Sequence, residues 1–202
     1  MAQSRLYRSL DIELPRLAAI YLDFSPRLNG AYTVTELSKA SAYTLFCHAE
    51  FEIFVEGWAT RILVRAKERW ISGKATRPTV ILSAMRSGRE SIQTVPSKDI
   101  WSEMAMSSIQ HHENVIRSNH GIREENICSL LGPLGVDLRN IDPILFGDMT
   151  AFGKIRGDHA HQAHKTQTKN LFDPFDRRSK ALKIAGLLND LDTALQSYLK
   201  SV

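Results

Sequence analysis

Cysteine is scarce in this sequence of 202 residues, which contains only Cys47 and Cys128. Both lie among apolar neighbours, in LFCHAEF and NICSLL, so each is predicted to be a small buried side chain rather than half of a disulfide. No run approaches the ~18 apolar residues of a membrane helix, and the opening stretch, MAQSRLYRSLDIELPRL, lacks the apolar core of a signal peptide. We therefore expect a reduced, soluble, cytoplasmic protein with no membrane partner.

Strand patterns and phosphate-binding loops are also missing. No alternating apolar and polar run extends beyond a few residues, and no glycine-rich loop joins a strand to a helix. Neither an internal repeat nor a low-complexity tract is visible. Hydrophobic residues make up 43% and charged residues 24% of the chain, with a formal net charge of +4. This composition fits one globular domain over 1–202, and the charge is compatible with a polyanionic partner without requiring one.

Helical periodicity fills nearly the whole chain and predicts an all-α bundle. The longest helix is expected to begin near Thr33 or Thr35, either of which can cap it, and to end near Trp70. A helix of that length is long for a globular protein and indicates a central spine.

Prolines mark two further helices. Pro15 interrupts an apolar stripe within residues 1–24 and predicts a kink or a break there. This N-terminal helix is expected to pack on a core that spans 30–200. Towards the other end of the chain, Asp142 can cap a helix that has Pro143 at its favoured first position.

The segment KIRGDHAHQAHK, residues 154–165, combines one arginine, one aspartate and three histidines. One interpretation is a solvated helix face. A second is a metal site, since His161 and His164 share a helical face and Asp158 lies three residues before His161. No cysteine lies nearby and the HExxH spacing is absent. A further metal ligand would have to come from His111, His112 or His120.

The third interpretation is acid–base chemistry on a phosphodiester. Cleavage of RNA by transesterification needs a base for the 2′-hydroxyl, an acid for the 5′ leaving oxygen and a cation for the phosphorane. Histidine titrates near pH 6.5 and serves either proton transfer, and arginine is a permanent planar cation. Arg156 and His161 lie ~140° apart around a helix and ~7.5 Å along it, so one helix does not easily close both around one phosphate. Two copies facing each other across a twofold axis could.

RGDHAH resembles the R-x4–6-H signature of HEPN domains, which are all-α bundles and in many cases RNases. The run YTLFCHAEFEIFVEGWATRIL, followed by GPLGVD and the motif helix, resembles the RiboL-PSP type of HEPN domain over roughly 30–200. The resemblance implies a homodimer whose two motifs line one cleft. It also implies cleavage of RNA without metal or cofactor, leaving a 2′,3′-cyclic phosphate, often by toxins or in defence against phage. Under it, Arg156 would stabilise the scissile phosphate and His161 would be the acid–base residue.

The sequence departs from that motif at one position. HEPN motifs usually place Asn, Asp or His directly after the arginine, where this chain has Gly157. Asp158 can substitute by fixing the imidazole tautomer of His161, or it can be structural. Glu50 or Glu52, on the long helix, could orient the arginine or a histidine from behind; an exposed polar face is the alternative for both.

Basic residues are available for an RNA backbone. Lys154, His164 and Lys165 surround the motif and are candidate RNA contacts. Arg61, Arg65 and Arg69 share one face of the long helix. We expect an RNase that acts as a homodimer. The alternative, favoured by Gly157, is an inactive HEPN module that binds RNA or a partner protein, such as a regulatory or antitoxin-type subunit.

Overall fold

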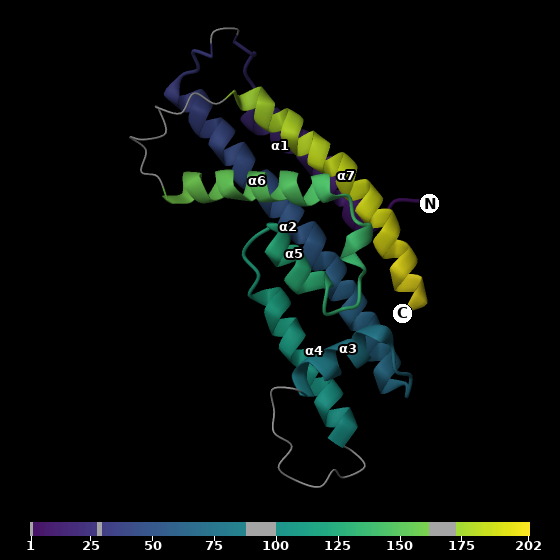
Figure 1. Cartoon of the computed structure of the whole chain (residues 1–202). Coiled ribbons are helices and arrows are strands. Elements are labelled where there is room, and N and C mark those ends of the chain that lie inside the picture. Colours follow the sequence, from purple (N-terminus) through teal and green to yellow (C-terminus); the bar gives the residue numbers. More distant parts are fainter. Residues whose placement is uncertain (1, 28–29, 88–99, 162–172) are drawn as a thin grey trace. The chain divides into compact units, whose positions relative to one another are not determined.

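The structure is a computed structural model (Figure 1). It describes residues 2–27, 30–87, 100–161 and 173–202; for 86, 87, 100 and 156–161 it describes the helical backbone alone. Within these ranges the chain is 80% helical and has no strand, which confirms the predicted all-α class. The α-helices are α1 (Arg5–Tyr21), α2 (Val34–Ile71), α3 (Arg77–Ser87), α4 (Ile100–Arg117), α5 (Glu124–Leu131), α6 (Pro143–His161) and α7 (Pro174–Ser201), and η1 (Leu138–Asn140) is a short 3-10 helix.

Internal contacts divide the chain into two compact units. The first comprises Met1–Phe54, Gly121–Glu124 and Asp142–Thr193; the second comprises Val55–His120, Glu125–Ile141 and Ala194–Val202. Helices α2 and α7 continue from one unit into the other, whereas α1 and α6 belong to the first unit and α3 and α4 to the second. The one-domain interpretation of 1–202 stays a prediction.

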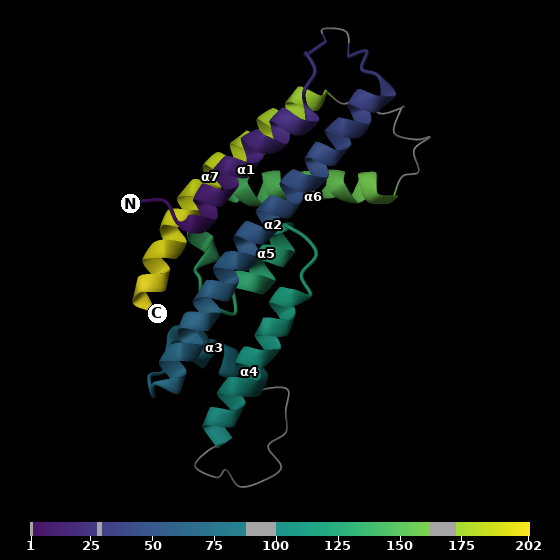
Figure 2. The ribbon, with the colours of Figure 1, turned by 180° about the vertical axis from the view of Figure 1, so that it is seen from behind.

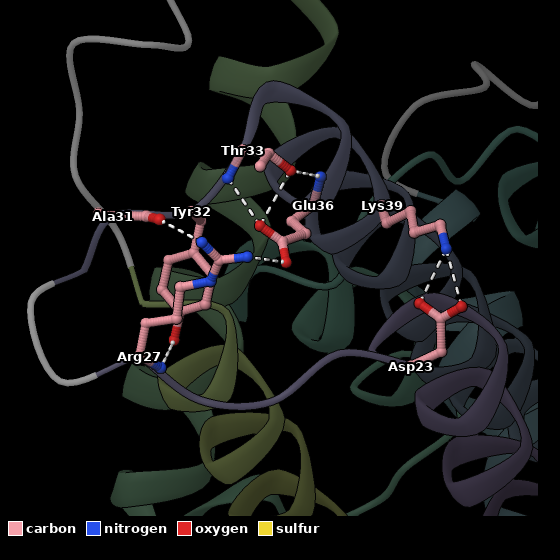
Figure 3. Close-up of polar contacts among 7 residues, drawn as sticks. All are labelled: Asp23, Arg27, Ala31, Tyr32, Thr33, Glu36 and Lys39. Atoms are coloured by element: carbon pink, nitrogen blue, oxygen red, sulfur yellow. Dashed lines mark hydrogen bonds and ion pairs between the residues drawn. The ribbon is translucent and has the colours of Figure 1, made fainter.

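A capping box starts the long helix α2 (Figure 3). Thr33 Oγ1 accepts the backbone N–H of Glu36 at 3.2 Å, and Glu36 Oε2 accepts the backbone N–H of Thr33 at 2.7 Å. The Arg27 guanidinium bridges to Glu36 Oε1 at 2.6 Å and to the Ala31 carbonyl at 2.9 Å. Thr33 is therefore the cap of the two predicted, and the 38 residues of α2 confirm the predicted long helix.

Helix α1 is continuous through Pro15, so of the predicted kink or break the break is wrong, and the kink stays a prediction. Pro15 lies on the exposed face of the helix, where water can solvate the carbonyl that loses its N–H partner. The opposite face is buried and consists of Tyr7, Leu10, Leu14, Leu17 and Ala18.

Within the first unit, α1 lies alongside α7 (Figures 1 and 2). The Asp192 carboxylate of α7 is fully buried and accepts the Ser4 backbone N–H at 2.9 Å and the Ser4 hydroxyl at 2.5 Å. The Ser4 oxygen in turn accepts the Tyr7 backbone N–H at 3.1 Å and caps α1. One buried carboxylate thus fixes the start of the first helix to the last.

Within the second unit, the GPLGVD stretch forms a tight loop after α5. Gly135 has a positive φ of 81°, and a Cβ at this position would lie 2.9 Å from the Tyr198 hydroxyl oxygen. That hydroxyl donates to the Leu134 carbonyl at 2.6 Å. The glycine is required both by its backbone conformation and by the tyrosine of α7 packed on it.

Candidate functional site

One uninterrupted helix carries the RGDHAH motif. The Asp142 carboxylate accepts the Ile144 backbone N–H at 2.8 Å, and α6 runs from Pro143 to His161, which confirms the predicted cap and start. Arg156, Asp158 and His161 are therefore all in α6, at positions for which the backbone is described.

The structure describes one of the three RNA-contact candidates that flank the motif. Lys154 is exposed on α6. His164 and Lys165 lie outside the described residues, so their proposed role stays a prediction.

Helix α6 crosses α2 within the first unit (Figures 1 and 2). At the crossing, the buried rings of Phe152 and Phe51 meet edge to face, with centroids 5.6 Å apart. On another side, Asp148 pairs with Lys183 of α7 at 2.8 Å. These contacts fix the helix just before the motif, which is the rigidity that a catalytic arrangement needs.

A buried histidine of α2 lies near Gly153 of α6. His48 is 3% exposed, and its Nδ1 is 3.9 Å from Glu52 Oε2. A Cβ on Gly153 would lie 3.9 Å from His48 Nε2. The His48 ring therefore lies beside Gly153, one helical turn before position 156, with Glu52 on the Nδ1 side of the ring.

The two glutamates proposed from the sequence lie on different sides of α2. Burial raises the pKa of Glu50, and the neighbouring Glu13 carboxylate of α1 raises it further, while Arg16 of α1 partly opposes both effects. Glu50 therefore faces α1. Glu52 pairs with His48 beside α6, so it is the better placed of the two to support the motif helix.

Sequence reasoning missed one cation at this site. Arg123 precedes α5, and its Cγ lies 3.5 Å from a Cβ position on Gly153. It is exposed, as is Lys154, so two basic side chains lie next to the start of the motif. No spacing rule links Arg123 to residues so far along the chain; the packing of the 121–124 segment against α6 brings them together.

The described residues give little support to a metal site or to a nucleophilic cysteine. Among them, no group of three or more His, Cys, Asp or Glu side chains could hold a metal ion. His112, one of the proposed additional ligands, is buried with Nε2 2.9 Å from the Leu130 carbonyl oxygen. Burial raises the pKa of the Cys47 thiol to about 12, so it is not a nucleophile at neutral pH.

Comparisons with known proteins add no relative. No protein-family model matches the chain, and neither a curated protein nor a solved structure matches it. None of the helices in the described part of the chain combines the length and apolarity needed to cross a bilayer. The described residues define an all-α protein. In it, the His48–Glu52 pair of α2 lies near α6, the helix that carries Arg156 and His161.

Proposed function

We propose that this protein is a metal-independent endoribonuclease of the HEPN type. The observation that carries the proposal is buried His48 of α2, which pairs with the half-buried Glu52 and lies beside Gly153, one turn before Arg156. A carboxylate on this side of α2 can hold a guanidinium carried by the motif helix, because a carboxylate and a planar cation form charge-assisted hydrogen bonds.

The chemistry is a transesterification that needs no external reactant. A His161 imidazole removes the proton of the 2′-hydroxyl, and the 2′-oxygen attacks phosphorus. The bond from phosphorus to the 5′-oxygen breaks, and a protonated His161 from the second copy gives its proton to that oxygen. Arg156 stabilises the negative charge of the phosphorane. The products are a 2′,3′-cyclic phosphate and a 5′-hydroxyl.

Two other residues position these groups. We expect the half-buried Glu52 carboxylate to hold the Arg156 guanidinium, since a carboxylate and a planar cation form paired hydrogen bonds. Asp158, three residues before His161, fixes the imidazole tautomer and takes the place of the polar residue that Gly157 lacks. Lys154, His164, Lys165 and Arg123 then contact the RNA backbone.

An exposed apolar stripe on α2 suits the homodimer. Leu45 is 38% and Ile53 is 56% exposed, and each lies four residues from Ala49. Residues at this spacing share a helix face. If two copies pair antiparallel about a twofold axis at Ala49, Leu45 of each copy meets Ile53 of the other. The twofold axis is perpendicular to the plane of the two paired helices. The helix faces that carry His48 and Glu52 in the two copies therefore lie on the same side of this plane, where two motifs can form one cleft.

Disulfide cross-linking tests this interface without using RNA. Ala49→Cys is expected to cross-link to itself. Leu45→Cys is not, because its two copies would be roughly 12 Å apart along the helices, beyond the ~7 Å that a disulfide spans. A mixture of Leu45→Cys and Ile53→Cys chains is expected to cross-link. Self-linking by Leu45→Cys, or none by Ala49→Cys, would reject this pairing.

The nuclease itself is tested by incubating the purified protein with total RNA in EDTA. The wild type is expected to cut, and Arg156→Ala and His161→Ala are each expected to lose on the order of hundredfold or more in rate. If both variants cut like the wild type, the site is wrongly assigned.

Gly157 favours one second candidate, an inactive HEPN module that binds RNA or a partner protein. Binding without cleavage by the wild type would select it. A role as a toxin or in phage defence, and a cytoplasmic location, belong to the same proposal.

A further inference from the structure

A shallow pocket lies in the second unit, between the last turns of α2 and the C-terminal end of α7. Its volume is about 500 Å³. The residues that matter for its chemistry are Arg61, Val64, Arg65, Glu68, Leu199 and Lys200. The described site on α6 uses none of them.

The pocket is electropositive. Three cations, Arg61, Arg65 and Lys200, face one carboxylate, Glu68, so the lining carries a formal charge of +2, three minus one. The Arg61 guanidinium lies over the Trp58 ring, 5.5 Å from its centroid, which holds the cation in place. Arg61 and Arg65 are four residues apart and therefore roughly 6 Å apart along one face of α2.

The floor between these cations is apolar. Val64 lies between the two arginines in sequence and is exposed, and Leu199 of α7 is half-buried. An anion alone gains nothing from these two side chains. A ligand that joins a flat apolar body to a phosphate uses both the floor and the rim.

We propose that this pocket binds one nucleotide of a single-stranded RNA, with the base on Val64 and Leu199 and the adjacent phosphates on Arg61, Arg65 and Lys200. This inference rests on the proposed function in that the RNA is the substrate. It also revises the basic face expected from the sequence: Lys200 of α7, and not Arg69, completes the cationic rim.

The binding test uses the full-length chain with His161→Ala, in EDTA, so that cleavage does not consume the ligand. The probe is a fluorescein-labelled single-stranded RNA, and its anisotropy is measured over a series of salt concentrations. Arg65→Ala and Lys200→Ala are each expected to weaken binding several-fold at low salt. Each is also expected to lower the slope of log affinity against log salt by roughly 0.7, the value for one phosphate of a single strand.

Two further variants sharpen the test. Glu68→Gln removes the one carboxylate and is expected to strengthen binding. Arg8→Ala removes an exposed cation of α1 and is the matched control. Thermal melts followed by circular dichroism check that every variant is folded.

The outcomes separate this inference from the nuclease. Equal effects of Arg65→Ala, Lys200→Ala and Arg8→Ala, or no binding of the RNA at all, would overturn the pocket proposal. Cleavage by the wild type is scored separately. Cleavage with no pocket effect rejects the pocket alone, and pocket-dependent binding without cleavage supports the pocket while rejecting the nuclease.

Discussion

Among the residues whose side chains the structure describes, two histidines are buried to nearly the same degree but have different surroundings. In the second unit, His112 is 2% exposed, and its Nε2 lies 2.9 Å from the carbonyl oxygen of Leu130. In the first unit, His48 is 3% exposed, and its Nδ1 lies 3.9 Å from a carboxylate oxygen of Glu52. The first ring lies against a backbone carbonyl, and the second lies near a side-chain carboxylate.

The partner of His112 explains why that histidine is buried. Leu130 lies in the last turn of α5, where backbone carbonyls have no partner within the helix. The imidazole N–H satisfies one of them, and burial lowers the pKa of His112, so the ring is neutral. Such a histidine is structural. His48 lies instead near the Glu52 carboxylate and Gly153 of the motif helix, so the two buried histidines differ in their surroundings rather than in their burial.

The largest difference between the surroundings of His48 and those of His112 is expected in the rate of RNA cleavage. Glu52→Gln should lower the rate by roughly ten- to hundredfold, because a charge-assisted hydrogen bond contributes about 1.5–3 kcal/mol. Glu50→Gln, on the α1 side of the same helix, should leave the rate unchanged. Both rates are measured on the same RNA in EDTA.

A rate loss in Glu50→Gln equal to that in Glu52→Gln would show that the side of α2 does not matter, which contradicts this assignment. The affinities of the two variants for RNA are also compared by anisotropy, so that weaker RNA binding is separated from slower cleavage.

The next effect is on stability. His112→Ala leaves the Leu130 carbonyl buried without its partner and should lower the free energy of unfolding by about 1–3 kcal/mol. Its cleavage rate per folded molecule should not change. His48→Ala should instead lower that rate. Urea unfolding and single-turnover cleavage measure the two quantities, and the contrast fails if His112→Ala cuts more slowly once corrected for the folded fraction.

The pH dependence of stability provides a smaller test. The folded-state pKa of His112 is lowered, so below the unfolded value of ~6.5 the unfolded chain binds more protons than the folded chain. Stability contributed by the neutral ring is therefore present above that pH and is lost as the pH falls below it. Relative to wild type, His112→Ala should show a flatter slope between about pH 7 and 5, by up to ~1.4 kcal/mol per pH unit. Parallel slopes would mean that His112 keeps its ordinary pKa.

The smallest effect is expected at the helix crossing. In Gly153→Ala the added methyl meets Ile122, Arg123 and His48 at 3.5–3.9 Å, which is ordinary contact. The gain of roughly 1 kcal/mol from alanine in a helix should then show as a slightly higher melting temperature, with cleavage retained. A large loss of stability would mean that α2 and α6 approach more closely at His48 than this geometry allows.

Local signals predicted much of the fold. The capping box at Thr33 and the Asp142–Pro143 start depend only on neighbouring residues, so the sequence reveals them. The effect of Pro15 depends on which face of α1 is buried, and the proline lies on the exposed one.

The candidate site was less predictable. That Arg156, Asp158 and His161 share one helix follows from periodicity. Which of Glu50 and Glu52 faces α6 depends on how two helices cross, and Arg123 comes to the site from a distant segment. Side-chain contacts between helices are set by tertiary packing, which a single sequence does not specify.

The measurement that tests the central claim most directly is the chemistry of the cut ends. RNA is cleaved by the wild type in EDTA, beside His161→Ala, and the fragment ends are identified. We expect 2′,3′-cyclic phosphate and 5′-hydroxyl ends, absent with His161→Ala, and no cleavage of the same sequence carrying 2′-O-methyl groups. Fragments with 3′-hydroxyl and 5′-phosphate ends, formed only when a divalent metal is restored, would contradict it.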